Sequence, residues 1–187
     1  EVHGGTSHNA IPSSSTATIV VDQRDTEKLQ ALLDQFQQDA RRMYPVENEL
    51  SVQFTAAAMP ASVLTVDERD DFLALAGLVP CGVQEMHPLV SDVVGTSGTL
   101  GVLSADSSQL EIRSFLRSCQ DAAMEAQGDF LAAAAEGFGY TAESDTYAAW
   151  PGVSEDPLST LLIQQGAAMG LTLRKNAVHV GLEPSVF

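Results

Sequence analysis

The residues of this chain that could ligate a metal ion are few and scattered. Its four histidines are His3, His8, His87 and His179. No two of them have the i, i+4 spacing that places both imidazoles on one face of a helix, and no cysteine pair accompanies them. The spacing therefore predicts no metal site made within this chain.

Nucleophilic and phosphate chemistry have no local signature either. The chain contains no Gly-x-Ser-x-Gly elbow and no phosphate-binding loop. The glycines between residues 93 and 103 do not have the dinucleotide-binding spacing, and no helix is expected directly after them. Cys81 and Cys119 lie far apart without motif spacing. We expect both to be buried thiols in a reducing compartment.

Two stretches contain residues that could bind a ligand. In residues 4–12, Gly4 and Gly5 allow a tight turn or a close backbone approach, and Asn9 offers amide donors and a carbonyl acceptor. This stretch is either a ligand-facing loop or a plain connector. Arg113 lies in a β-rich stretch, where a guanidinium either pairs with a surface carboxylate or binds an anionic ligand through two hydrogen bonds.

Composition limits the class of protein. The chain has 187 residues, 44% of them hydrophobic, which is enough for one domain or one and a half. Its net charge of −16 argues against nucleic-acid and anionic-membrane partners. No stretch approaches the roughly 20 apolar residues of a membrane span, and no signal peptide is visible. Glu1 is not a natural start, so we expect a missing N-terminal portion. The two separate cysteines and the lack of a visible signal peptide lead us to expect a cytoplasmic protein.

Periodicity predicts the elements of the first half. Residues 16–21 read as a strand, and apolar residues at spacings of three and four predict an amphipathic helix over 26–43. Alternation predicts a half-buried strand over 50–54. Thr65 and Glu68 form a capping box that begins another helix, closed by Gly77 and Pro80.

The second half continues with strands and helices and predicts an α+β fold. An antiparallel sheet with helices packed on one face accounts for the order of elements. The expected elements are an irregular loop over 80–88, a hairpin of strands 93–103 and 110–114 around a turn at 106–108, a helix from 116 to 137 or 139, a strand over 140–147, a turn at 150–153, a helix over 157–169 and a strand over 173–180.

Several short motifs resemble one known family. Gly4-Gly5-x-x-x-Asn9-Ala10-Ile11-Pro12 resembles the lid-domain motif of the M20 metallopeptidases, above all the carnosinase-like aminoacyl-histidine dipeptidases. Five further motifs follow in the order of that family. They are Pro80-Cys81-Gly82-Val83, residues 93–101, Ile112-Arg113-Ser114, Trp150-Pro151-Gly152 with Asp156-Pro157-Leu158, and His179-Val180-Gly181-Leu182-Glu183.

The resemblance implies a fold, an activity and a place in a larger protein. It implies a ferredoxin-like lid, or dimerisation, domain over residues 1–150 and a return segment toward a catalytic domain over 151–187. The family hydrolyses short peptides such as Xaa-His dipeptides with two metal ions, usually zinc, and a carboxylate base. Those ligands and that base are expected in the catalytic domain, so this chain is expected to contain no catalytic residue and no metal ligand. A homodimer is also implied.

The resemblance also assigns substrate-binding residues. Asn9 corresponds to an asparagine that hydrogen-bonds the substrate, and Arg113 to an arginine that holds the substrate carboxylate. His179 and Glu183 match the family motif as well. They are expected among the substrate-binding residues, but the resemblance gives neither of them a specific role.

The chain departs from the family pattern at two places, which leaves its specificity open. Pro184 and Ser185 replace a Cys-Gly pair, and Thr99 replaces an asparagine. The alternative is a non-catalytic ferredoxin-like module that binds a small ligand or self-associates. A His-x-Asp motif and paired acidic residues upstream in the full coding sequence would support the peptidase.

Overall fold

The computed structural model describes residues 1–47, 49–149 and 156–180, and its centre is the long strand β4 (Val94–Ala105). One edge of β4 pairs with β5 (Leu110–Ser118). The other edge is shared, because β3 (Gly82–Met86) pairs with residues 94–98 and β1 (Val2–Gly4) with residues 103–105. The short strand β2 (Ser15–Ala17) extends the sheet beyond β1. All pairings are antiparallel.

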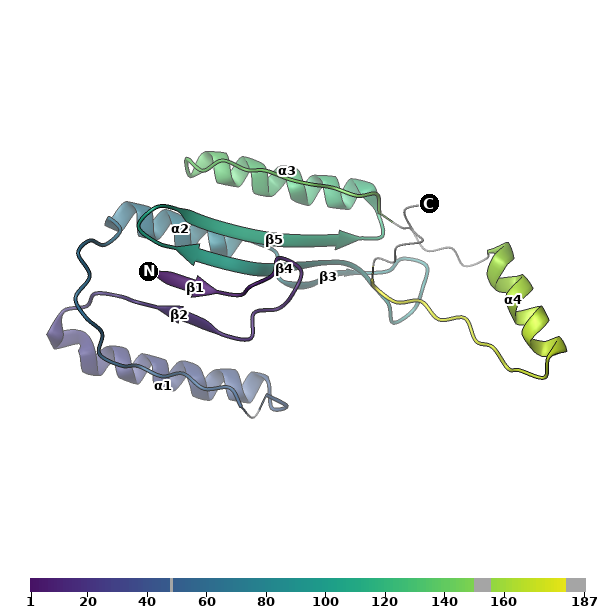
Figure 1. The fold of residues 1–187 in the computed structure, drawn as a ribbon, viewed down its shortest axis with the longest axis horizontal. Coiled ribbons are helices and arrows are strands. Elements are labelled where there is room, and N and C mark those ends of the chain that lie inside the picture. Colours follow the sequence, from purple (N-terminus) through teal and green to yellow (C-terminus); the bar gives the residue numbers. More distant parts are fainter. Residues whose placement is uncertain (48, 150–155, 181–187) are drawn as a thin grey trace.

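Helices α2 (Val66–Leu78) and α3 (Asp121–Gly137) form the helical layer of the fold (Figure 1). α3 packs against β5 and against α2. Thr96 and Ser118 are buried beneath this layer and share a hydrogen bond of 2.9 Å between their hydroxyls. The expected α+β architecture with an antiparallel sheet is confirmed. Its apolar core is made by Phe72, Leu75, Val79, Ala105, Cys119, Met124 and Ala135.

The other two helices lie at the periphery in Figure 1. α1 (Thr26–Met43) follows a single 3-10 turn, η1 (Gln23–Asp25), and runs beyond the outer strand β2. α4 (Pro157–Ala168) lies apart from the sheet. No helix in the described ranges has the length and apolar character needed to cross a membrane.

The helices confirm the local signals in the sequence. α1 has the predicted bounds, and α4 agrees with its prediction to within one residue. The capping box is complete, because the Glu68 N–H donates to Thr65 Oγ1 at 3.2 Å and the Thr65 N–H donates to Glu68 Oε2 at 2.8 Å. The start of α3 was predicted too early, since residues 116–118 belong to β5.

The strand predicted over 50–54 is wrong, although its alternation is real. Val52 and Phe54 are half-buried, and Ser51, Gln53 and Thr55 are exposed. Two backbone groups of this segment bond to side chains of α1: Arg41 Nε donates to the Leu50 carbonyl at 2.9 Å, and the Val52 N–H donates to Gln37 Oε1 at 2.6 Å. The alternation thus reflects packing beside a helix and no sheet ladder.

Other strand predictions fail at the ends of the sheet. Instead of residues 16–21, β2 covers Ser15–Ala17. The last bond between β1 and β2 runs from the Thr18 N–H to the Glu1 carbonyl at 2.8 Å, and residues 19–21 pair with no strand in the described ranges. Residues 140–147 and 173–180 form no strand. The turn predicted at 150–153 lies outside the described residues.

The prediction of an irregular loop over 80–88 is also wrong, because a strand, β3, lies within these residues. Pro80 and Gly82 suggested a break, and the ladder is indeed irregular, with register shifts between Val83 and Met86. β3 nevertheless pairs with β4 along its length. Cys81, directly before β3, is exposed, against the expectation of a buried thiol, whereas Cys119 is buried as expected.

Candidate functional site

The loop of residues 5–12 occupies the gap that β1 and β3 leave along one edge of β4. Gly5 has φ +75°, and a Cβ built there would lie 1.9 Å from the Gly101 carbonyl oxygen. A Cβ built on Gly101 would in turn lie 2.3 Å from the His8 carbonyl oxygen. Both positions therefore need glycine, because only a residue without Cβ permits this approach of two backbones. Two distant glycine-containing motifs of the sequence meet here.

Gly101 also lies at an irregularity of the central ladder. Leu100 pairs with Ser114 and Val102 with Arg113, so β4 carries one extra residue at this point, as in a β-bulge. β5 has no such insertion, and its side chains alternate regularly between the two faces. Ser118 is buried under the helices, so Arg113, Phe115 and Arg117 lie on the opposite face of the sheet. We call this opposite face the arginine face.

A cluster around Phe115 links the loop to the arginine face. The His8 ring meets the Phe115 ring edge-on, with centroids 5.3 Å apart and planes at 60°. The Tyr147 ring lies 6.2 Å from Phe115 between centroids. The guanidinium carbon of Arg117 lies 4.9 Å from the Phe115 centroid, within the range of a cation–π interaction. We call these four residues the Phe115 cluster.

His179 joins the same face although it is distant in sequence. Its Nε2 lies 2.8 Å from the hydroxyl of Ser97, which pairs with Arg117 across the ladder. Burial lowers the pKa of His179, the charge of Arg117 lowers it further, and a hydrogen bond with the Val94 backbone partly opposes both. The neutral imidazole is therefore favoured near neutral pH.

Asn9 and Arg113 have local partners. Ser7 Oγ donates to Asn9 Oδ1 at 2.7 Å, and Asn9 is exposed on the loop. Arg113 directs Nε and Nη2 to a single oxygen of Glu111, each at 2.8 Å, and its side chain is 59% exposed. Of the two roles that the sequence left open for Arg113, pairing with a surface carboxylate is the one present here. Glu183 lies outside the described residues.

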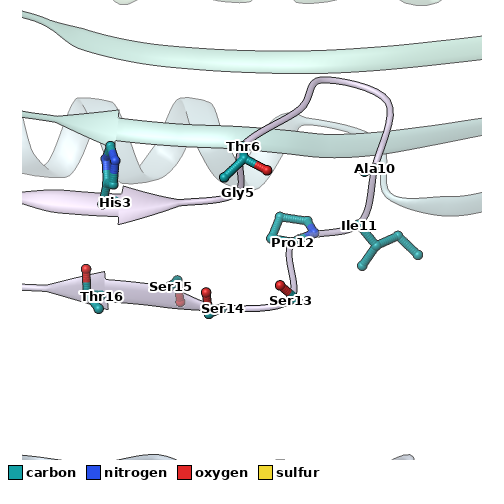
Figure 2. Close-up of a pocket in the computed structure, with 10 residues that line it drawn as sticks. All are labelled: His3, Gly5, Thr6, Ala10, Ile11, Pro12, Ser13, Ser14, Ser15 and Thr16. Atoms are coloured by element: carbon teal, nitrogen blue, oxygen red, sulfur yellow. The ribbon is translucent and has the colours of Figure 1, made fainter.

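A hollow of about 370 Å³ lies on the other side of the loop, inside the β1–β2 connection (Figure 2). His3, Ala10 and Pro12 line it together with the hydroxyl-bearing residues Thr6 and 13–16. Hydroxyl groups and apolar side chains thus line this recess together, and it shares the loop with Asn9.

The site offers groups that bind and orient a ligand. Within the described ranges no group of three or more His, Cys, Asp or Glu side chains could hold a metal ion. The residues therefore do not fit the metal pair that the family resemblance implies, and no metal-dependent step is assigned to them. An amide, guanidinium groups, hydroxyls and an aromatic surface are available instead.

Sequence reasoning missed His8 as a packing residue, and it also missed Ser97, Phe115 and Arg117. Phe115 and Arg117 follow Arg113 at intervals of two, which is the period of one strand face. That signal was present in the sequence, but the strand was expected to end near residue 114. The contact of Ser97 with His179 has no comparable local signal.

Comparison with known proteins places the chain beside peptidases. No protein-family model matches it. It is 27% identical over 194 residues to the cytosol non-specific dipeptidase of Escherichia coli (strain K12), an alignment that spans the whole chain and 39% of that protein. The crystal structure of an aminoacylhistidine dipeptidase from Vibrio alginolyticus matches the whole chain and 39% of its own length, with a TM-score of 0.85 and 24% identity.

These matches confirm the resemblance to aminoacyl-histidine dipeptidases and the fold. The structural match shows the fold, and the sequence match extends over the full length of the chain. The chain spans about two-fifths of the length of the proteins it matches.

Proposed function

We propose that this chain is the substrate-capturing lid portion of a metal-dependent dipeptidase. Residues 1–150 would form the lid and residues 151–187 the return toward a catalytic domain. The two zinc ions and the carboxylate base would belong to that domain, outside this chain. The names of both relatives, a non-specific dipeptidase and an aminoacylhistidine dipeptidase, support dipeptides as substrates.

The observation that carries the proposal is the seating of the loop on β4. The motif at residues 4–12 and the glycine-rich motif at 93–101 are the first and third of the motifs that resemble the dipeptidases. They meet where Gly5 and Gly101 approach each other, and His8 then contacts Phe115 on the arginine face. Asn9 directly follows His8, which supports a position for it beside the face that carries Arg113.

The residues of the chain would act by holding the substrate. Asn9 would hydrogen-bond the peptide, and Arg113 would exchange Glu111 for the substrate carboxylate. An exposed ion pair is worth roughly 0–1 kcal/mol, whereas hydrogen bonds to charged groups in a closed site are worth about 1.5–3 kcal/mol each. The exchange is therefore favourable once closure of the lid excludes water. The metal pair would supply an activated water and polarise the scissile carbonyl.

Partners and compartment follow as part of the proposal. The exposed outer strand β2 and exposed apolar residues after it, Ile19, Val20 and Val21, support a homodimer formed along this edge. Light scattering over a wide concentration range should detect self-association, and a strictly monomeric profile would contradict it.

The net charge of −16 supports neither nucleic acid nor an anionic membrane as a partner. The name of the Escherichia coli relative supports a cytosolic location.

The decisive experiment uses the natural full-length protein that contains this chain. Purified with zinc or manganese, it should hydrolyse Xaa-His dipeptides, lose activity with a chelator and recover it on addition of metal. The chain from Glu1 to Phe187 alone should show no turnover above blank. Turnover by the isolated chain would contradict the lid assignment. Absence of turnover in the full-length protein would favour the non-catalytic module.

A further inference from the structure

Among the residues that the structure describes, Arg117 has no carboxylate partner, although the chain is strongly acidic. The sequence has 25 acidic residues and nine lysines and arginines. Arg24, Arg42, Arg69, Arg113 and Lys175 each pair with a carboxylate. In the part of the chain that the structure describes, Arg117 has no carboxylate within 4.0 Å and no hydrogen bond, although it is half-buried.

The guanidinium of Arg117 is held in place by its neighbours. It lies over the Phe115 ring at 4.9 Å from the centroid, and His8 contacts the same ring. An aromatic ring beneath the guanidinium satisfies its charge in part and leaves N–H groups for a planar carboxylate. Ser97, opposite Arg117 in the ladder, is bonded to His179 Nε2 at 2.8 Å, which holds the imidazole near the guanidinium. These groups provide a prearranged corner for an anion.

The direction of the side chain relates Arg117 to Arg113. The two residues are four apart on β5, which places their Cα atoms roughly 13 Å from each other. Phe115 lies between them, so a guanidinium over Phe115 leans toward Arg113. Arg113 itself bonds Glu111 on its other side, so in the proposed exchange it would turn from Glu111 toward the substrate while Arg117 faces the same substrate from beyond Phe115. A single cation is sufficient for a neutral dipeptide.

We infer that Arg117 is a specificity-determining residue that binds the side-chain carboxylate of dipeptides containing Asp or Glu. The inference rests on the proposed function, in which Arg113 takes the terminal carboxylate. The role of Arg117 follows from its lack of a carboxylate partner within the described ranges, its contact with Phe115 and its lean toward Arg113.

The test compares isosteric substrates in the full-length, metal-loaded protein. The pairs are Ala-Glu with Ala-Gln and Ala-Asp with Ala-Asn, measured as kcat and KM separately. The wild type should favour the acidic member of a pair. Arg117→Gln should lower kcat/KM for the acidic member on the order of ten- to a hundredfold, mainly through KM, and change the amide member less than about twofold. Arg117→Lys should restore part of the preference.

A matched control removes the same charge elsewhere. The Arg24 side chain is 87% exposed, and its partner is Asp22. Arg24→Gln should leave the acid-to-amide ratio unchanged. If Arg117→Gln lowers the melting temperature by several degrees, the comparison is made with Arg117→Lys, which keeps the charge and should still raise KM for the acidic member.

Two results would overturn the inference and leave the proposed function standing. One is hydrolysis by the wild type without preference for the acidic member. The other is an equal loss on acidic and amide substrates in the Arg117 variants, since that indicates a general structural role. Absence of hydrolysis of every dipeptide would instead contradict the proposed function, and the inference with it.

Discussion

The contact between Gly101 and the loop of residues 5–12 should make the site sensitive to a single methyl group. In Gly101→Ala the new Cβ would lie 2.3 Å from the His8 carbonyl oxygen and 2.6 Å from His8 Cα. Ordinary contacts begin at 3.4 Å, so the loop must move by about 1 Å. A displacement of about 1 Å in a positioning group costs on the order of a hundredfold in rate. We expect kcat/KM of the full-length protein to fall by about ten- to a hundredfold.

The assay for this prediction is steady-state hydrolysis of a dipeptide, with the melting temperature recorded on the same preparation. Gly128→Ala in α3 is the control, because a Cβ there meets no atom within 4 Å. Alanine is favoured over glycine in a helix by about 1 kcal/mol, so this variant should be as stable or more stable, with unchanged kinetics. Unchanged kcat/KM in Gly101→Ala would refute the role of this contact in placing Asn9.

Three further predictions concern residues elsewhere in the fold. Arg113→Ala should lower kcat/KM on the order of ten- to a hundredfold, and Arg113→Lys should recover only part of it. The melting temperature of Arg113→Ala should barely change, because the exposed pair with Glu111 is worth less than about 1 kcal/mol. An unchanged kcat/KM would indicate that Arg113 serves only as a surface ion pair. Thr65→Ala removes the N-cap of α2 and should lower the free energy of unfolding in urea by about 1 kcal/mol, whereas an unaltered midpoint would contradict the capping box. The lowered pKa of His179 means that the unfolded chain takes up this proton first as pH falls, so the free energy of unfolding should decrease below about pH 6.5, and His179→Gln should make that decrease smaller.

Local signals in the sequence predicted α1, α4 and the start of α2 well. The bounds of α1 follow from apolar spacing, and the start of α2 follows from Thr65 and Glu68, because a helix satisfies its backbone bonds within itself. A strand needs a partner strand for its backbone hydrogen bonds, and the local sequence does not identify that partner. Residues 50–54 show the alternation of a strand, but two of their backbone groups bond to the side chains of Gln37 and Arg41 of α1.

The candidate site could be predicted only in part for the same reason. Asn9 and Arg113 were identified through motifs, and the structure brings the loop and β5 to one face of the sheet. The stack of Arg117 on Phe115 requires knowledge that β5 continues to Ser118. The contact of Ser97 with His179 joins residues 82 positions apart, so it depends on the path of the whole chain after α3.

The central claim is that this chain captures the substrate while the metal ions are held elsewhere in the full-length protein. The most direct test is Asn9→Ala, with kcat/KM for a dipeptide and bound zinc measured on the same sample. Loss of one or two neutral hydrogen bonds should lower kcat/KM by roughly three- to thirtyfold, and the zinc content should equal that of the wild type. Unchanged kcat/KM, or a loss of activity that follows a loss of zinc, would contradict the account.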